Sequence, residues 1–222
     1  MQVAIPIYEG FTALDAIGPY DVLQSVPGTE VVFCAPETGI HRTERGQLGI
    51  NADRTLDEVD SPDVVVVPGG LGNRRWLEGP NAYTEWLQKV HETTTWTTSV
   101  CTGSLMLAAA GILDGVDATT HWCAREGLAE LGANPVSERV VWRGKVVTAA
   151  GVSSGIDMAL QLVHEMYGEI AAQAVQLGIE YDPDPPHDSG SVEKASPEVV
   201  AAVRQVMETS DAEVAERLGI PG

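Results

Sequence analysis

Residues 63–70 read Asp-Val-Val-Val-Val-Pro-Gly-Gly and contain the least ambiguous strand of the chain. The four successive valines are β-branched with no polar residue among them, which is typical of a parallel strand covered on both faces. The Pro-Gly-Gly that follows ends the strand and offers backbone N–H groups that no side chain obstructs. The stretch predicts a central parallel strand, with a turn at the carboxyl end where open α/β sheets bind ligands.

Strands and helices alternate on both sides of this stretch. Apolar runs predict further strands at residues 3–8, 30–35 and 96–100. Apolar residues at helical spacing predict helices at residues 14–26, 81–91, 102–110, 126–131, 156–167 and 169–177. Residues 139–142 and 145–149 flank Arg143 and Gly144 and predict a hairpin. The alternation predicts an α/β three-layer sandwich with a mostly parallel central sheet.

The chain has no internal repeat and no shift in composition, so we expect one domain over residues 1–222. Its last part, residues 181–222, is predicted as an extended arm followed by terminal helices. Residues 181–191 are polar and proline-rich, and residues 197–207 and 212–218 have helical spacing. The second of these helices faintly resembles the first helix of a helix-turn-helix, but no recognition helix follows it, which argues against DNA binding.

The composition is that of a globular protein: 44% of the 222 residues are hydrophobic and 20% are charged. The three cysteines are too widely spaced for a disulfide framework or a zinc knuckle, and the five histidines show no metal-site spacing. The apolar runs are too short to span a bilayer, and Met1 leads directly into a strand-like stretch. We therefore expect a cytoplasmic protein with no membrane contact and no metal.

The net charge of −19 is unusual, because 32 acidic residues face only 13 lysines and arginines. Such a balance argues against nucleic acid and anionic membranes as partners, since phosphate binding needs clustered cations. The acids are spread along the chain and only three of the cations are lysines, which favours an acidic surface adapted to a cytoplasm of high salt. We give this charge no catalytic meaning.

The chemistry is indicated by residues 97–111, Thr-Thr-Ser-Val-Cys-Thr-Gly-Ser-Leu-Met-Leu-Ala-Ala-Ala-Gly. A strand runs directly into Cys101 and then into small residues and a helix, which is the strand–nucleophile–helix turn called a nucleophile elbow. A thiol there lies at a helix N-terminus, which we expect to lower its pKa. The alternative is a buried structural cysteine, an interpretation that fits Cys34 and Cys123 better.

A thiolate that attacks an electrophile needs hydrogen-bond donors for the developing anion and a group that moves protons. The N–H groups of Gly70 and Thr102 are the candidate donors. Asp15, in Ala-Leu-Asp-Ala-Ile-Gly-Pro at residues 13–19, opens the first helix at the same edge of the sheet. It is the candidate proton relay, and the alternative is an ordinary first-turn acid.

These residues belong to blocks that resemble the ThiJ/PfpI superfamily and, within it, the isonitrile (isocyanide) hydratase branch. The blocks are FTALDAIGPYDVL at residues 11–23, VVVPGG at 65–70, SVCTGSLMLAAAGILDG at 99–115, ATTHW at 118–122, RVVWRGKVVTAAGVSSGIDMALQLV at 139–163 and QLGIEYDPDPPHDSG at 176–190. The resemblance runs nearly end to end. It implies a flavodoxin-like sandwich, related to class I glutamine amidotransferases, and a homodimer.

The resemblance also implies a reaction. Cys101 is then the nucleophile and Asp15 the acidic partner beside it. The thiolate attacks the terminal carbon of an isocyanide, and the thioimidate takes up water to release an N-substituted formamide. This makes the protein a lyase of the hydro-lyase type that acts on a small molecule and needs no metal or organic cofactor.

Some positions depart from related branches. Thr102 stands where the protease-like branch has a histidine, and no His-x-Glu pair of the amidotransferase kind is present. His121 either orients the substrate or is an ordinary structural histidine. Two alternatives remain open: a glyoxalase or deglycase acting on reactive carbonyls, which usually goes with Glu at position 15 and a Cys–His pair, and a non-enzymatic redox or ligand sensor that uses oxidation of Cys101.

Overall fold

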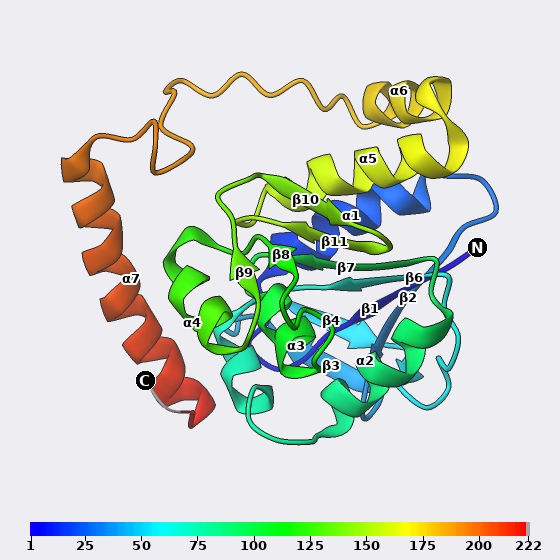
Figure 1. Ribbon diagram of the computed structural model, residues 1–222, viewed down its shortest axis with the longest axis horizontal. Coiled ribbons are helices and arrows are strands. Elements are labelled where there is room, and N and C mark those ends of the chain that lie inside the picture. Colours follow the sequence, from blue (N-terminus) through cyan, green and yellow to red (C-terminus); the bar gives the residue numbers. More distant parts are fainter. Residues whose placement is uncertain (221–222) are drawn as a thin grey trace.

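The protein is described by a computed structural model over residues 1–220, and its centre is a seven-stranded sheet (Figure 1). The strand order is β10-β11-β7-β6-β1-β2-β5. The strands are β1 (Gln2–Pro6), β2 (Glu30–Ala35), β5 (Arg54–Thr55), β6 (Val64–Val67), β7 (Trp96–Val100), β10 (Val140–Arg143) and β11 (Val146–Ala149). Every neighbouring pair is parallel except the β10–β11 hairpin, which confirms the mostly parallel sheet.

The strand of four valines, β6, lies in the middle of this sheet between β1 and β7. All four valine side chains are buried, as expected for a strand covered on both faces. The turn that follows β6 and the end of β7 therefore lie side by side at the carboxyl edge of the sheet. This places the two stretches singled out in the sequence next to each other.

Helices cover both faces of the sheet (Figure 1) and complete the predicted three layers. One layer contains α1 (Ala13–Gln24) and α5 (Ser154–Tyr167), which pack on each other, with α6 (Glu169–Gly178) outside α5. The other contains α2 (Ala82–Thr93) and α3 (Gly103–Ala109). None of the helices described is long and apolar enough to cross a membrane.

Smaller elements surround the carboxyl edge of the sheet. They are the hairpin of β3 (Gly39–Arg42) and β4 (Gly49–Ala52), the pair of β8 (Asp117–Ala118) and β9 (Asn134–Pro135), the 3₁₀ helices η1 (Leu71–Trp76) and η2 (Trp122–Ala124), and α4 (Arg125–Glu130). The β3–β4 hairpin was not predicted, because its two strands are short, each begins with glycine and carries only one isoleucine, and only Ala52 of their residues is buried. It nevertheless contributes to the site described below.

The last part of the chain differs from the prediction. One continuous helix, α7 (Pro197–Leu218), replaces the two terminal helices expected at residues 197–207 and 212–218. The side chains of Ser210 and Asp211, in the stretch between the two expected helices, bind Arg45 and Arg74 of the body. The final two residues of the predicted tail, 221–222, lie outside the described part of the chain.

Helix α7 is joined to α6 by a long, mostly exposed arm, residues 181–196, that crosses from one end of the molecule to the other (Figure 1). The buried contacts of α7 with the body lie in its second half, at Val214, Ala215 and Leu218, while Arg204 and Met207 of the first half contact Trp122 and Cys123. Arg45 pairs with Glu213, and Arg217 binds Glu9, so ionic contacts accompany this apolar packing. The helix is therefore a cover that the arm brings onto the carboxyl edge of the sheet.

The charge of −19 leads to a prediction about salt. We expect the unfolding midpoint to rise by roughly 5 °C or more, equivalent to about 1–2 kcal/mol, between 0.1 M and 2 M KCl. The reason is that the screening length shortens from about 10 Å to below about 3 Å, which removes repulsion among the acids. The exposed ion pairs that salt also weakens contribute little to stability. Thermal unfolding followed by circular dichroism measures the effect.

Excluded salt also favours burial of apolar surface, so the control must change charge alone. A variant with Glu37→Gln, Asp57→Asn and Glu92→Gln, at three exposed acids, should gain less stability from KCl than the parent. A parent protein whose midpoint does not change with KCl would contradict a surface adapted to high salt.

Candidate active site

Cys101 occupies a strained turn between β7 and α3. Its φ of +56° lies in the left-handed region. Among the non-glycine residues described, Glu180 is the one other residue with a positive φ. A Cβ at Gly103 would lie 2.1 Å from the carbonyl oxygen of Val67, so the chain after the cysteine packs directly against β6. The geometry is that of the predicted elbow, with the thiol at the carboxyl edge of the sheet.

Hydrogen bonds on both sides of Cys101 hold this conformation. Its N–H donates to the carbonyls of Ala149 and Ala150 at 3.0 and 2.8 Å. Its carbonyl accepts from the hydroxyls of Ser104 and Thr120, each at 3.1 Å. A strained backbone persists where its surroundings fix it in this way, and such positions cluster at functional sites.

The glycine turn after β6 positions three side chains around the elbow. Three consecutive N–H groups each donate to one side-chain oxygen at 2.9 Å: Gly69 to Asp15 Oδ2, Gly70 to Thr102 Oγ1 and Leu71 to Glu44 Oε1. A Cβ at Gly69 would lie 2.6 Å from the nitrogen of Thr102, so only glycine allows this close approach. The turn thus orders Asp15, Thr102 and Glu44 through its own backbone.

The hydrogen bonds of the turn affect the two N–H groups that were predicted to stabilise an anion, those of Gly70 and Thr102. The Gly70 N–H is engaged by the Thr102 hydroxyl, so donating to a substrate requires that bond to open. The N–H groups of Thr102 and Val152 instead face the Cys101 sulfur as hydrogen-bond donors. The roles of Gly70 and Thr102 toward substrate stay predictions, and Val152 is a donor that the sequence did not indicate.

Asp15 is completely buried in α1, beside the Cys101 thiol. Its Oδ2 accepts the bond from Gly69, while Oδ1 has no nitrogen or oxygen partner among the described residues. Burial raises the pKa of this carboxyl from 3.8 to about 8; the hydrogen bond from Gly69 lowers it by less, the charge of Glu44 raises it further, and the hydrogen bond with Cys101 lowers it. Asp15 is therefore mostly protonated at neutral pH and can donate a proton.

The pKa of Cys101 is shifted in the direction opposite to the expectation. Burial raises it, and so does the charge of Asp15, whereas the N–H groups of Thr102 and Val152 lower it by less. Desolvation outweighs the backbone dipoles because the sulfur is enclosed. At neutral pH the site therefore holds a neutral thiol next to a neutral carboxyl.

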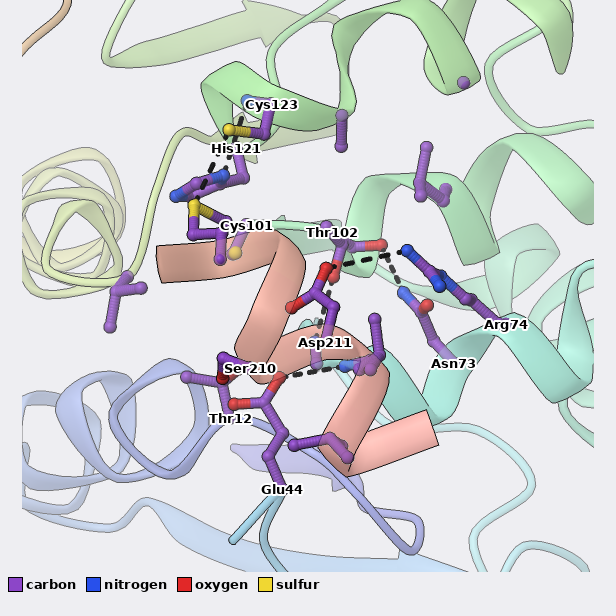
Figure 2. Close-up of a pocket in the computed structure, with 18 of the residues that line it drawn as sticks. Thr12, Glu44, Asn73, Arg74, Cys101, Thr102, His121, Cys123, Ser210 and Asp211 are labelled. Carbon is purple, nitrogen blue, oxygen red and sulfur yellow. Dashed lines mark hydrogen bonds and ion pairs between the residues drawn. The ribbon is translucent and has the colours of Figure 1, made fainter. Parts of the chain in front are cut away.

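The thiol opens into a cavity of about 520 Å³ (Figure 2). Its apolar surface comes from Leu71, Leu77, Leu105, Val152, Met207 and Val214, and its polar surface includes Glu44, Arg45, Asn73, Arg74, His121 and Asp211. Helix α7 supplies Met207, Ser210, Asp211 and Val214, so the end of the described chain closes the cavity. This volume suits a small organic molecule.

His121 lines the same cavity, at the start of η2. Its Nδ1 accepts a bond from the Cys123 N–H at 3.4 Å, and its Cδ2 lies so close to Gly151 that a Cβ there would be 2.8 Å away. Burial lowers the pKa of His121, so the ring is neutral at pH 7. Its position agrees with a residue that contacts substrate, and that role stays a prediction.

The two other cysteines differ from each other. Cys34 is buried in β2, as expected of a structural cysteine. Cys123 is exposed and lines the cavity, 3.6 Å from the sulfur of Met207, so its interpretation as a buried structural residue is wrong. No group of three or more metal-binding side chains occurs within residues 1–220.

Comparisons with known proteins agree with this geometry. Residues 1–165 match the DJ-1/PfpI family. An isonitrile hydratase of Pseudomonas putida is 39% identical over 205 residues, which are 92% of this chain and 89% of that protein. The crystal structure of a ThiJ/PfpI family protein from Pseudomonas syringae superposes with a TM-score of 0.88 at 32% identity, covering 99% of this chain and 90% of the other. Oxidized DJ-1 of Toxoplasma gondii gives a TM-score of 0.71 at 26% identity, covering 82% and 99%.

Proposed function

Because the chain belongs to the DJ-1/PfpI family, we propose that it is an enzyme that hydrates isocyanides to N-substituted formamides. The observation that carries the proposal is the Cys101 thiol, which lines the cavity, with the buried Asp15 carboxyl hydrogen-bonded to it from behind the cavity wall. The similarity to the hydratase over most of both chains supports the same chemistry. The reaction makes the protein a lyase that acts on a small molecule.

In the first step, the terminal carbon of R–N≡C must gain a proton and a sulfur. Asp15 gives its proton to that carbon as Cys101 attacks it, and the carboxylate then takes the thiol proton. The product is the thioimidate R–N=CH–S–Cys101. A neutral thiol–carboxyl pair suits this step because no isolated charge is buried before substrate arrives.

In the second step, water adds to the thioimidate carbon. The carboxyl group of Asp15 passes a proton from water to the nitrogen, which gives R–NH–CH(OH)–S–Cys101. The C–S bond then breaks, the hydroxyl proton returns to sulfur, and R–NH–CHO leaves. The sum is one isocyanide plus one water to one formamide, with both protein groups restored. The residues used are all present in the chain, and we propose that no cofactor takes part.

The proposal is tested with purified protein and an alkyl isocyanide, with the formamide measured by chromatography. Methylglyoxal in parallel tests the glyoxalase or deglycase alternative, and mass spectrometry of Cys101 after mild peroxide tests the sensor alternative. We expect formamide with the isocyanide and no turnover of methylglyoxal. Turnover of methylglyoxal alone would replace the proposal by the carbonyl alternative.

We also propose a cytoplasmic homodimer. The free thiols of the three cysteines suit a reducing compartment. On α6, Ile170 and Leu177 are 78% and 76% exposed, which is an apolar surface available for a second copy. Light scattering in molar salt should give about twice the monomer mass of 23.6 kDa.

A further inference from the structure

We propose that Glu44 is a specificity-determining residue, which binds a positively charged ammonium group on the part of the substrate remote from the reacting carbon. The inference rests on the proposed function, since it names the class of isocyanide that the same cavity prefers. Glu44 is a cavity-lining acid that the reaction above does not use.

Glu44 is held at the cavity wall by hydrogen bonds to both its backbone and its side chain. It lies in the loop between β3 and β4, and its N–H donates to the carbonyl of Phe11 at 3.2 Å. Its Oε1 accepts from Leu71, the third donor of the glycine turn, and Thr12 hydrogen-bonds to the same side chain. Figure 2 shows the carboxylate on the floor of the cavity beneath Ser210 of α7. A fixed carboxylate at a cavity wall is suited to select a ligand.

The charge of Glu44 has no ion-pair partner within residues 1–220. The two arginines that line the cavity are paired with acids of α7, Arg45 with Glu213 and Arg74 with Asp211. Burial raises the pKa of Glu44, the hydrogen bonds from Leu71 and Thr12 lower it, and the charges of Asp211 and Arg45 have the smallest effects, in opposite directions. Partly buried carboxylates are usually paired, so this one is suited to receive its cation from a ligand.

The cavity has room and capacity for such a ligand. An ionised carboxylate has about four acceptor sites, and the bonds from Leu71 and Thr12 leave others open. Leu77, Met207 and Val214 provide apolar surface for a carbon chain between the two ends of the substrate. An ammonium group that reaches Glu44 forms a charge-assisted hydrogen bond, which is stronger than a neutral one.

Binding at Glu44 can be measured apart from the chemistry at Cys101, although the charge of Glu44 contributes to raising the pKa of both Asp15 and Cys101. Asp15 and Glu44 accept from different N–H groups of the turn, Gly69 and Leu71, and no hydrogen bond joins the two carboxyls among the described residues. A change at Glu44 therefore leaves the hydrogen bonds of Asp15 in place, and its effect on the pKa of Asp15 and Cys101 is common to all substrates, so it cancels when two substrates are compared.

The test uses three isocyanides of equal chain length, ending in an ammonium, a methyl or a carboxylate group, at one fixed KCl concentration because salt screens the interaction. The measured quantity is the ratio of kcat/KM for the ammonium substrate to that for the methyl substrate. We expect the parent to prefer ammonium over carboxylate, and Glu44→Gln to lower the ratio about ten-fold or more. Glutamine keeps the acceptor for Leu71, so the loop is preserved.

The matched control is Glu37→Gln, which removes the same charge from an exposed position outside the cavity and should leave the ratio unchanged. A parent that prefers the carboxylate substrate, or a ratio that Glu44→Gln and Glu37→Gln change equally, would overturn the assignment.

Binding without turnover separates this proposal from the proposed function. Calorimetry with hexylammonium and hexanoate should show tighter binding of the ammonium ion by the parent, and a loss of that preference in Glu44→Gln. If no isocyanide is hydrated but this preference is found, the reaction is wrong and the ligand class stands. If isocyanides are hydrated and the ammonium ion shows no preference, the reaction stands and the role of Glu44 is wrong.

Discussion

Replacing Cys101 with alanine should reduce isocyanide turnover by about 10⁴-fold or more, because the bond from sulfur to the substrate carbon can no longer form. We expect neither of the other cysteines to replace it as the nucleophile. Cys34 is buried in β2, and Cys123 is an exposed residue of η2. Initial rates of formamide formation measure the loss. Far-ultraviolet circular dichroism should show an unchanged fold, because alanine is smaller than cysteine.

Two cysteine variants serve as controls. Cys34→Ala should keep nearly full activity at some loss of stability, since it removes a buried sulfur that does not line the cavity. Cys123→Ala tests whether any thiol at the cavity suffices, and it should keep the reaction because the elbow is intact. Turnover by Cys101→Ala at the parent rate would exclude the covalent mechanism.

Replacing Asp15 with asparagine should lower turnover by about 10²- to 10⁴-fold while the fold is retained. Asparagine keeps the shape and the acceptor for the Gly69 N–H, but it carries no proton to move. Single-turnover kinetics should show that thioimidate formation itself slows, since Asp15 acts in that step. Activity equal to that of the parent would exclude Asp15 as the proton relay.

The same variant predicts a change in the pH dependence of stability. The folded pKa of Asp15 is about 8 against the ordinary value of 3.8, so folded parent protein binds this proton more tightly than unfolded protein does. Its contribution to stability is therefore complete below about pH 4 and is lost progressively as the pH rises to about 8. Asparagine has no such loss.

From pH 4 to pH 9, Asp15→Asn should thus gain stability relative to the parent, by at most about 5 kcal/mol. Urea unfolding of both proteins at the two pH values, in the same KCl, measures the difference. A constant difference between variant and parent would mean that Asp15 titrates in the folded protein as it does in water.

The central fold and the elbow were predictable because their residues carry local signals. The valines of β6 have the composition of a buried parallel strand, and the small residues after Cys101 are those that a sharp strand-to-helix turn needs. Asp15 was found for a topological reason: the first helix of a parallel sheet begins at the same edge as the elbow. These features depend on short stretches of sequence and on the general rules of α/β sheets.

The missed features depend on contacts between distant parts of the chain. Glu44 lies in a polar loop without periodicity, and only the packing of the β3–β4 loop against the glycine turn brings it to the cavity. The contacts of α7 with the body involve Arg45 and Arg74, more than a hundred residues earlier, which bind Ser210 and Asp211 in the stretch that was expected to separate two helices. The raised pKa of Cys101 results from burial that no local pattern reveals.

The division of the cavity between two parts of the chain has a consequence for how such an enzyme changes over generations. The proposed reacting groups are ordered by contacts made within residues 10–152, whereas Met207 and Val214 line the cavity from a helix attached by an exposed arm. Mutations on that helix reshape the space for the substrate without touching the nucleophile or its acid. We therefore expect single substitutions in α7 to change substrate preference while the reaction is kept. The glycine turn binds three side chains at once, so we expect almost every substitution there to disturb the reacting groups.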